Sequence, residues 1–102
     1  MEEGEQMLKI ELTDDAMDYI RKKNTDSITV DMMSIYYGGQ YNEPVVPIGK
    51  PSFPQNYDRI DVNGIKVYIF KGAETEPGGI KISVEESNQR LHVTGLVYDK
   101  TG

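Results

Sequence analysis

The feature that most constrains the fold is the dipeptide Asn63-Gly64, which lies between two runs of alternating apolar and polar residues. Residues 58–62 precede it and residues 65–70 follow it, and both runs place apolar side chains at every second position. The two central residues of a type I′ turn both need a positive φ, and Asn and Gly adopt that conformation most easily. The sequence therefore predicts a tight β-hairpin in the middle of the chain.

Short runs with the same period recur along the chain, and turn signals separate them about every 8 to 12 residues. Val45, Val46 and Ile48 indicate another extended segment, which Pro44 and Pro47 restrict to an edge or irregular strand because proline cannot donate to a ladder. Further strands are predicted over residues 7–12, 27–33, 80–84 and 91–98.

One helix is predicted over residues 14–23. Thr13 is a favourable N-cap, Asp14 and Asp15 lie in the first turn where the helix dipole favours acidic side chains, and Asn24 suits the position after the helix end. One short helix with about six or seven short strands indicates a mainly β domain of the α+β kind. We expect two packed sheets or a flattened barrel.

A chain of 102 residues is expected to form a single domain, here residues 7–102. Residues 1–6 are acidic and polar, so we expect them to be a disordered tail. No apolar run approaches the roughly 20 residues that cross a bilayer, and the acidic N-terminus lacks the basic and apolar segments of a signal peptide. We therefore expect a cytoplasmic protein.

The charge of the chain argues against two classes of partner. The formal net charge is −6 and the isoelectric point is about 4.7. The only basic run, residues 21–23, lies at the end of the predicted helix, where cations complement the helix dipole. Since phosphate groups meet net repulsion, we expect no binding to nucleic acid or to anionic membranes.

The chain contains no cysteine. This excludes disulfides, thiolate nucleophiles and metal or iron–sulfur sites that cysteine ligates. The one histidine, His92, lies between Leu91 and Val93 and is expected on the opposite, solvent-facing side of a strand. No nucleophile or ligand spacing accompanies it, so we expect no cofactor and no enzymatic activity.

The candidate site lies in residues 34–44, where three tyrosines surround a Gly-Gly pair in what we expect to be a loop. The tyrosines could close a sheet edge and have a structural role. Alternatively, they form an aromatic pocket that a ligand or partner approaches over the glycine backbone. A phenolate can also bind ferric iron, with Glu43 and Asp31 as the nearby carboxylates. The candidate residues are Tyr36, Tyr37, Gly38, Gly39, Tyr41 and Glu43.

Four methionines are expected to be adaptable core fillers. The adjacent pair Met32-Met33 comes directly before the tyrosine stretch, so it could also line a surface that binds a partner. The four residues are Met7, Met17, Met32 and Met33.

Three stretches, taken in their order and spacing, resemble the HesB-like family, the A-type carriers of iron–sulfur cluster assembly. They are residues 12–16 (Leu-Thr-Asp-Asp-Ala) at the start of the helix, residues 62–69 at the central hairpin, and Gly78-Gly79 before the strand of residues 80–84. The resemblance covers about residues 8–98 and is greatest to a short subgroup of HesB-related proteins, some of which carry selenocysteine. It implies a HesB-like flattened β-barrel or sandwich with one N-terminal helix.

In that family, the loop after the second β segment carries a reactive cysteine or selenocysteine before a small residue and a glycine. The pattern aligns with residues 37–39 (Tyr-Gly-Gly), with Tyr36 just before it and Tyr41 at the aromatic position that often follows. The family's C-terminal Cys-Gly-Cys motif is also absent. A cluster carrier needs thiolates to hold iron and sulfide, so the resemblance implies the fold without cluster transfer.

We therefore hypothesise a non-enzymatic HesB-like protein that has lost its cluster-ligating residues. It acts by contact with a protein partner, or as a homodimer, through residues 36–43. A link to iron–sulfur or sulfur/selenium metabolism rests on the resemblance alone. The alternatives are a small-molecule-binding module, in which the tyrosines stack on a flat ligand, and a mononuclear iron site of tyrosine and carboxylate.

Overall fold

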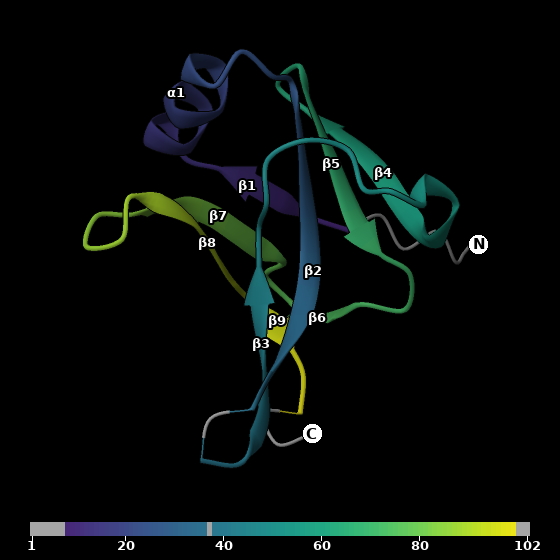
Figure 1. The fold of residues 1–102 in the computed structure, drawn as a ribbon. Coiled ribbons are helices and arrows are strands. Elements are labelled where there is room, and N and C mark those ends of the chain that lie inside the picture. Colours follow the sequence, from purple (N-terminus) through teal and green to yellow (C-terminus); the bar gives the residue numbers. More distant parts are fainter. Residues whose placement is uncertain (1–7, 37, 100–102) are drawn as a thin grey trace, which may run out of the picture.

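The computed structural model describes residues 8–36 and 38–99. Within this part of the chain, it contains one α-helix, one short 3₁₀-helix and nine short strands (Figure 1). None of the helices described is long and apolar enough to cross a membrane. The helices are α1 (Asp14–Lys22) and η1 (Pro54–Asn56). The strands are β1 (Ile10–Leu12), β2 (Ser27–Tyr36), β3 (Gln40–Val45), β4 (Tyr57–Val62), β5 (Ile65–Phe70), β6 (Glu74–Thr75), β7 (Ile80–Glu85), β8 (Arg90–Thr94) and β9 (Leu96–Val97).

The largest sheet has four strands in the order β3-β2-β5-β4. β4 and β5 form the predicted hairpin, with Val62 opposite Ile65 and the turn residues Asn63 and Gly64 at φ 51° and 86°. Both values are positive, as a type I′ turn requires, which confirms the prediction made from this dipeptide. β5 also pairs in parallel with the start of β2, over Ser27–Val30.

A second sheet has three strands in the order β1-β7-β8, in which β1 runs parallel to β7 and β8 runs antiparallel to it. A third sheet consists of the two short strands β6 and β9. Figure 1 shows the sheet of β1, β7 and β8 beside the longer strands β2 and β5, with α1 at one end. The fold is therefore mainly β, as predicted, and it is built from open sheets rather than a closed barrel.

The helix begins and ends where its sequence signals indicate. The Thr13 hydroxyl accepts a hydrogen bond from the backbone N–H of Ala16 at 3.3 Å, which satisfies one of the free donors at the helix start. Asn24 has φ 56°, the left-handed conformation that commonly follows a helix. Only one face of the helix is buried, and its buried residues are Ala16 and Ile20.

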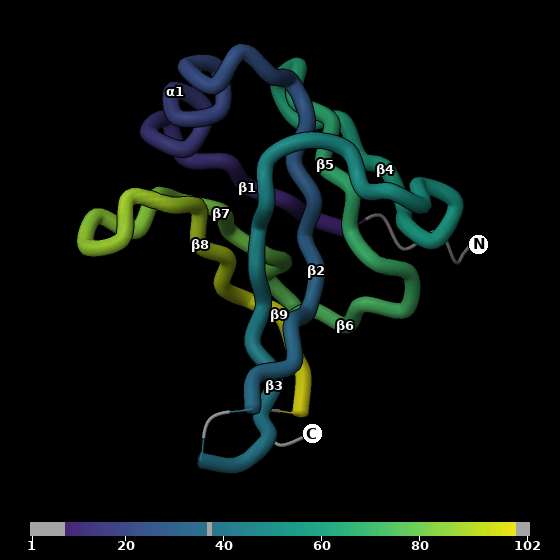
Figure 2. Tube along the Cα trace, in the orientation of Figure 1, coloured from purple at the N-terminus to yellow at the C-terminus, as the bar shows by residue number. Residues whose placement is uncertain are grey.

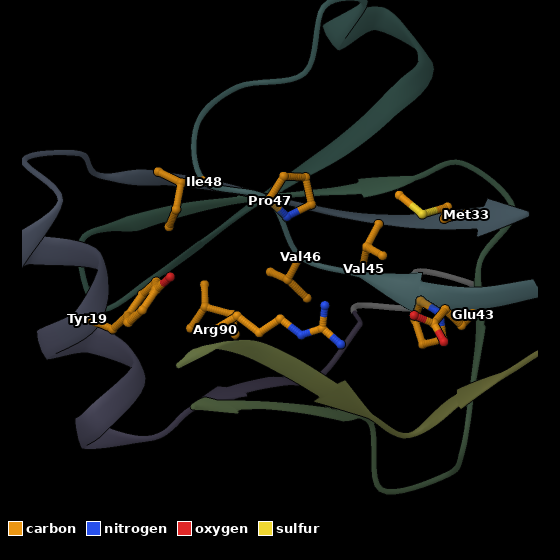
Figure 3. A pocket seen from close by; sticks show the side chains of 10 residues that line it. Tyr19, Met33, Glu43, Val45, Val46, Pro47, Ile48 and Arg90 are labelled. Atoms are coloured by element: carbon orange, nitrogen blue, oxygen red, sulfur yellow. The ribbon is translucent and has the colours of Figure 1, made fainter. Parts of the chain in front are cut away.

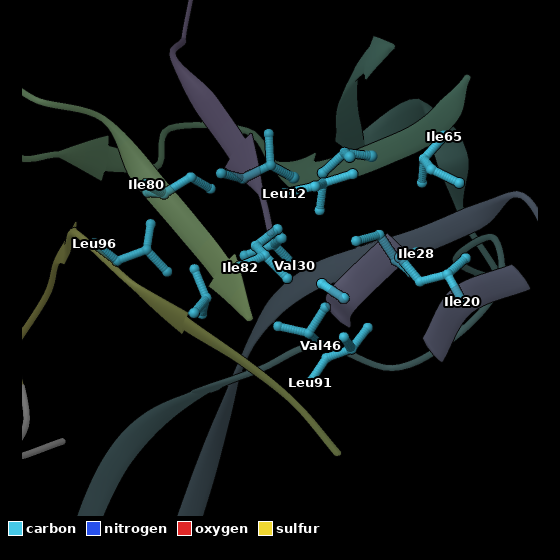
Figure 4. Close-up of a cluster of buried hydrophobic side chains, with 14 residues drawn as sticks. Leu12, Ile20, Ile28, Val30, Val46, Ile65, Ile80, Ile82, Leu91 and Leu96 are labelled. Carbon is cyan, nitrogen blue, oxygen red and sulfur yellow. The ribbon is translucent and has the colours of Figure 1, made fainter. Parts of the chain in front are cut away.

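One hydrophobic core fills the space between the sheets and the helix (Figure 4). The two larger sheets, β9, the helix and Val46 all contribute buried side chains to it, and five members are fully buried aliphatic side chains at β-strand positions. These five are Ile28, Val30, Val67, Ile69 and Ile82.

The expectations for the tyrosine stretch and for Met33 were wrong in part. Most of residues 34–44 are not loop, because β2 continues to Tyr36 and β3 begins at Gln40. Met33 is 50% exposed and is not a core residue, whereas Met17 packs against the core as predicted. Met33 lies in the part of β2 that pairs with β3 alone, beyond the last residue that pairs with β5.

The strand expected over residues 91–98 is interrupted at Gly95, and the turn region before β7 contains the short strand β6 that pairs with β9. Gly95 has φ 98° and lies so close to Gly79 that a Cβ atom would clash with the Gly79 carbonyl oxygen. A Cβ on Gly79 would clash in turn with the backbone of Lys9. The backbones at Lys9, Gly79 and Gly95 therefore lie too close together for a side chain at either glycine. This close approach coincides with the break between β8 and β9.

We predict that Gly95→Ala destabilises the fold by at least about 3 kcal/mol, because it adds a backbone clash to the strain of a positive φ. Gly72→Ala is the matched control, since Gly72 has φ 85° but open space where a Cβ would lie. It should cost about 1 kcal/mol from strain alone. Urea unfolding measures both, and equal losses in the two variants would contradict the close approach at Gly95.

Candidate functional site

The predicted site residues lie on a two-stranded arm formed by Asp31–Tyr36 of β2 and Gln40–Val45 of β3. β5 pairs with β2 only over Ser27–Val30, so the arm extends beyond the four-stranded part of the sheet. Figure 2 shows the described part of this arm extending past the yellow segment that contains β9. A two-stranded ribbon is marginally stable by itself, so the arm depends on further contacts.

The tip of the arm contains the Gly-Gly pair of the sequence. Gly38 has φ 70° and Gly39 has φ 144°, and the space where a Cβ would lie is open at both residues. Side-chain residues rarely adopt these conformations, which explains the two glycines. The third tip residue, Tyr37, lies outside the described residues.

The two faces of the arm carry different side chains. Cross-strand pairing places Ile35 opposite Tyr41 and Met33 opposite Glu43, so these four side chains share one face. Tyr36 is the next residue along β2 and points to the other face, where its side chain is 74% exposed. Tyr41 and Glu43 are half-buried. The structure therefore places Tyr36 and Tyr41 on opposite faces of one ribbon.

Two hydrogen bonds connect the arm to the end of the chain. The Asn42 side-chain amide donates to the carbonyl oxygen of Asp99 at 3.0 Å, and the Ser34 hydroxyl donates to the side-chain oxygen of Asn42, also at 3.0 Å. Asn42 and Asp99 are 57 residues apart in sequence. This contact ties the arm to the segment after β9, which supplements the marginal stability of the ribbon.

A groove of about 320 Å³ runs along β3 at the base of the arm (Figure 3). Tyr19 of α1 lies at one end, and Met33 and Glu43 of the arm lie at the other. Arg90, the first residue of β8, extends its guanidinium group into the middle of the view. The remaining lining side chains are mostly aliphatic and come from residues 44–48 and Leu91.

Two further cavities flank β2 and β3. One of about 400 Å³ lies against β8 and β9 and is lined in part by Glu43, His92 and Tyr98. The other, of about 390 Å³, is lined in part by Asp31 and Tyr57. None of the three cavities is lined by Tyr36 or Tyr41.

The Asp31 carboxylate accepts two hydrogen bonds, from the Tyr57 hydroxyl at 2.5 Å and from the backbone N–H of Met32 at 2.9 Å. The bond from Tyr57, together with partial desolvation and the charge of Asp31, raises the pKa of the Tyr57 phenol. This contact between tyrosine and carboxylate involves neither Tyr36 nor Tyr41.

The metal-ligating side chains of the described residues are dispersed. No group of three or more His, Asp or Glu side chains in this part of the chain is close enough to hold a metal ion. His92 is exposed on β8, between the buried Leu91 and Val93, as the alternation predicted. The arrangement therefore offers surfaces and grooves for binding rather than a cluster of reactive groups.

Comparison with protein families identifies the chain. Residues 8–96 match the model of the CC/Se motif containing family. The chain belongs to this family. No curated protein and no solved structure matches it.

The family name refers to a CC/Se motif, whereas this chain contains no cysteine. This member of the CC/Se motif containing family therefore matches the family over residues 8–96 but contains no cysteine thiol. Its described surface presents the arm and the grooves instead.

Sequence analysis missed several residues of these surfaces. Tyr19 and Arg90 reach the same groove from α1 and β8. Asp31 was named as a candidate carboxylate, but its hydrogen-bond partner Tyr57, 26 positions away, was not predicted. No local pattern indicates such contacts, because they depend on how the sheets pack. Pro44 and Pro47 were the available signal in the sequence. They indicate an edge strand, and the unpaired side of an edge strand can border a groove.

We predict that a titration of tyrosinate absorbance shows a phase above the usual range of a tyrosine phenol, because the hydrogen bond to Asp31 raises the pKa of Tyr57. The Tyr57→Phe and Asp31→Asn variants should both lose this late phase, whereas Tyr36→Phe should retain it. A raised folded-state pKa stabilises the fold below the unfolded pKa of about 10, and this contribution is lost as the pH rises through the folded value. Wild-type stability should therefore fall more steeply above about pH 10 than that of Tyr57→Phe. A late phase that persists in Tyr57→Phe would contradict the assignment.

Proposed function

We propose that the chain is a non-enzymatic protein-interaction module whose contact surface is the arm. The observation that carries this proposal is the exposure of Tyr36 and Met33, at 74% and 50%, on a ribbon that projects from the sheet. Aromatic side chains and methionine are enriched in protein interfaces, and tyrosine is frequent among the residues that dominate binding energy. Side chains of this kind contribute most to the free energy of binding when a partner buries them.

The partner that we propose is a second copy of the chain. An arm with exposed apolar groups on both faces can pack against the same arm of another copy across a two-fold axis, which gives a self-complementary interface. Each chain carries a net charge of −6, so two copies repel each other over long range. Added salt screens this repulsion, and association through the apolar arm should therefore strengthen as the ionic strength rises.

The amino-acid composition, rather than membership of the CC/Se motif containing family, supports the non-enzymatic part of the proposal. The absence of cysteine removes the thiolates that cluster binding or redox chemistry uses. We further propose that the chain is related to HesB-like proteins and that Tyr37 occupies the position of their reactive cysteine or selenocysteine, with Tyr36 just before it. A role beside iron–sulfur or sulfur/selenium metabolism rests on that resemblance alone.

The geometry gives less support to the two alternatives. A flat ligand stacked between Tyr36 and Tyr41 needs both rings on one face, whereas the register places them on opposite faces. A tyrosinate iron site at the arm needs further ligands, and the described carboxylates and His92 form no group of three. The exposed arm is therefore the better basis for a function.

We predict that the wild-type chain dimerises with a dissociation constant of about 10 μM. Met33→Ser and Tyr36→Ser should each weaken dimerisation at least about tenfold, because each removes a side chain that the partner copy buries. Phe53→Ser is the matched control, since Phe53 is 62% exposed but lies outside the arm. Sedimentation equilibrium gives the constants. The thermal midpoint of all three variants should match that of the wild type when it is measured well below the dissociation constant, where dimerisation adds no stability.

Three results would contradict this proposal. The first is a wild-type chain that stays monomeric at about 1 mM. The second is an equal loss of dimerisation in Phe53→Ser and in the arm variants, which would place the interface elsewhere on the surface. A dimer that weakens rather than strengthens with added salt would also exclude an interface that forms against like-charge repulsion.

A further inference from the structure

The groove along β3 contains two side chains of opposite charge. Arg90 and Glu43 both line it, and no ion pair joins them among the described residues (Figure 3). Glu43 makes no side-chain hydrogen bond or ion pair in this part of the chain. Each charge is therefore available to a bound molecule.

Arg90 retains most of its donors. Its one described ion pair joins Nε to Glu85 Oε1 at 3.4 Å, a long contact between partly exposed side chains. Exposed pairs of this kind contribute little to stability. The two terminal nitrogens of the guanidinium group are not used in this contact, and they form the planar fork that binds a carboxylate in two parallel hydrogen bonds.

The wall between the two charges is apolar. Val45 and Val46 lie between the Arg90 guanidinium and Glu43 in Figure 3. Ile48 and Leu91 are further aliphatic residues of the groove. The groove has a volume of about 320 Å³, which lies at the lower end of the range of small-molecule sites. A ligand of this groove therefore has a small apolar body.

We propose that the groove binds a free apolar α-amino acid in its zwitterionic form. The α-carboxylate lies against the Arg90 guanidinium, the α-ammonium lies against the Glu43 carboxylate, and the side chain packs against Val45 and Val46. A simple carboxylic acid would meet the repulsion of Glu43 and of the net charge of −6, and a simple amine would meet that of Arg90. A molecule that carries both charges close together satisfies both groups.

Because the groove shares Met33 and Glu43 with the arm, the test uses the Tyr36→Ser chain as well as the wild type, so that dimerisation does not cover the groove. L-leucine is the probe, titrated to about 20 mM into the purified, isotope-labelled chain while backbone amide signals are recorded by NMR. We expect saturable shifts at residues 44–48 and 90–91, with a dissociation constant of about 1 mM because both charges are partly exposed. Glycine should bind at least about tenfold more weakly, since it lacks the apolar side chain.

Two analogues and four variants test the assignment of the charges. N-acetyl-L-leucine lacks the ammonium group and L-leucinamide lacks the carboxylate, and each should bind at least about tenfold more weakly than L-leucine. Arg90→Gln and Glu43→Gln should reduce L-leucine binding by a similar factor. Arg59→Gln and Glu74→Gln are the matched controls and should leave binding unchanged, because Arg59 is exposed in an ion pair with Asp61 and Glu74 is exposed in β6.

The proposal is overturned if L-leucine gives no saturable shifts, or if these shifts lie outside the groove. Binding of either analogue as tight as that of L-leucine would also overturn it, since a site for one charge does not require both. The analogues act on the wild-type chain, so this test holds even if a variant is unstable. Equal effects of Arg90→Gln and Arg59→Gln would show that net charge, rather than the groove, controls the binding.

Discussion

The parallel pairing of β2 with β5 over Ser27–Val30 is the contact on which the rest of the structure depends. All four residues of β2 in this pairing are buried. Ile28 and Val30 belong to the core, while the Thr29 hydroxyl donates to the Gly49 carbonyl oxygen at 2.8 Å and its backbone N–H donates to that of Pro47 at 3.0 Å. The start of β2 is thus covered on both faces, which fixes the position of every strand that pairs with it.

The limited length of this pairing also creates both candidate surfaces. β5 covers four residues of a ten-residue strand, so the remainder of β2 continues with β3 alone and forms the arm. β3 is an edge strand, and Pro44 prevents it from offering a complete row of backbone donors to a further strand. Its open side faces β8 and α1 across a groove instead. The same edge therefore supplies a projecting surface at one end and a binding groove at the other.

The local parts of this fold could be predicted from the sequence. Asn63-Gly64 placed the central hairpin, Thr13 and Asn24 placed the two ends of the helix, and the alternation around His92 placed that side chain on the solvent face. Each of these signals acts through a few neighbouring residues. The division of the last strand at Gly95 was not predicted, because it depends on the backbone of Gly79, which another part of the chain supplies.

The sequence by itself determined the mainly β class, the α-helix near the N-terminus and the absence of cysteine from a chain whose family is described by a CC/Se motif. Only the tertiary structure decided that the tyrosine stretch is a ribbon with Tyr36 and Tyr41 on opposite faces, and that Arg90 and Glu43 share a groove. The physical reason is the range of the interactions. Turns and helix caps depend on residues a few positions apart in the sequence. The exposure of a strand and the lining of a groove depend instead on which strands, distant in the sequence, pair with it and where that pairing ends.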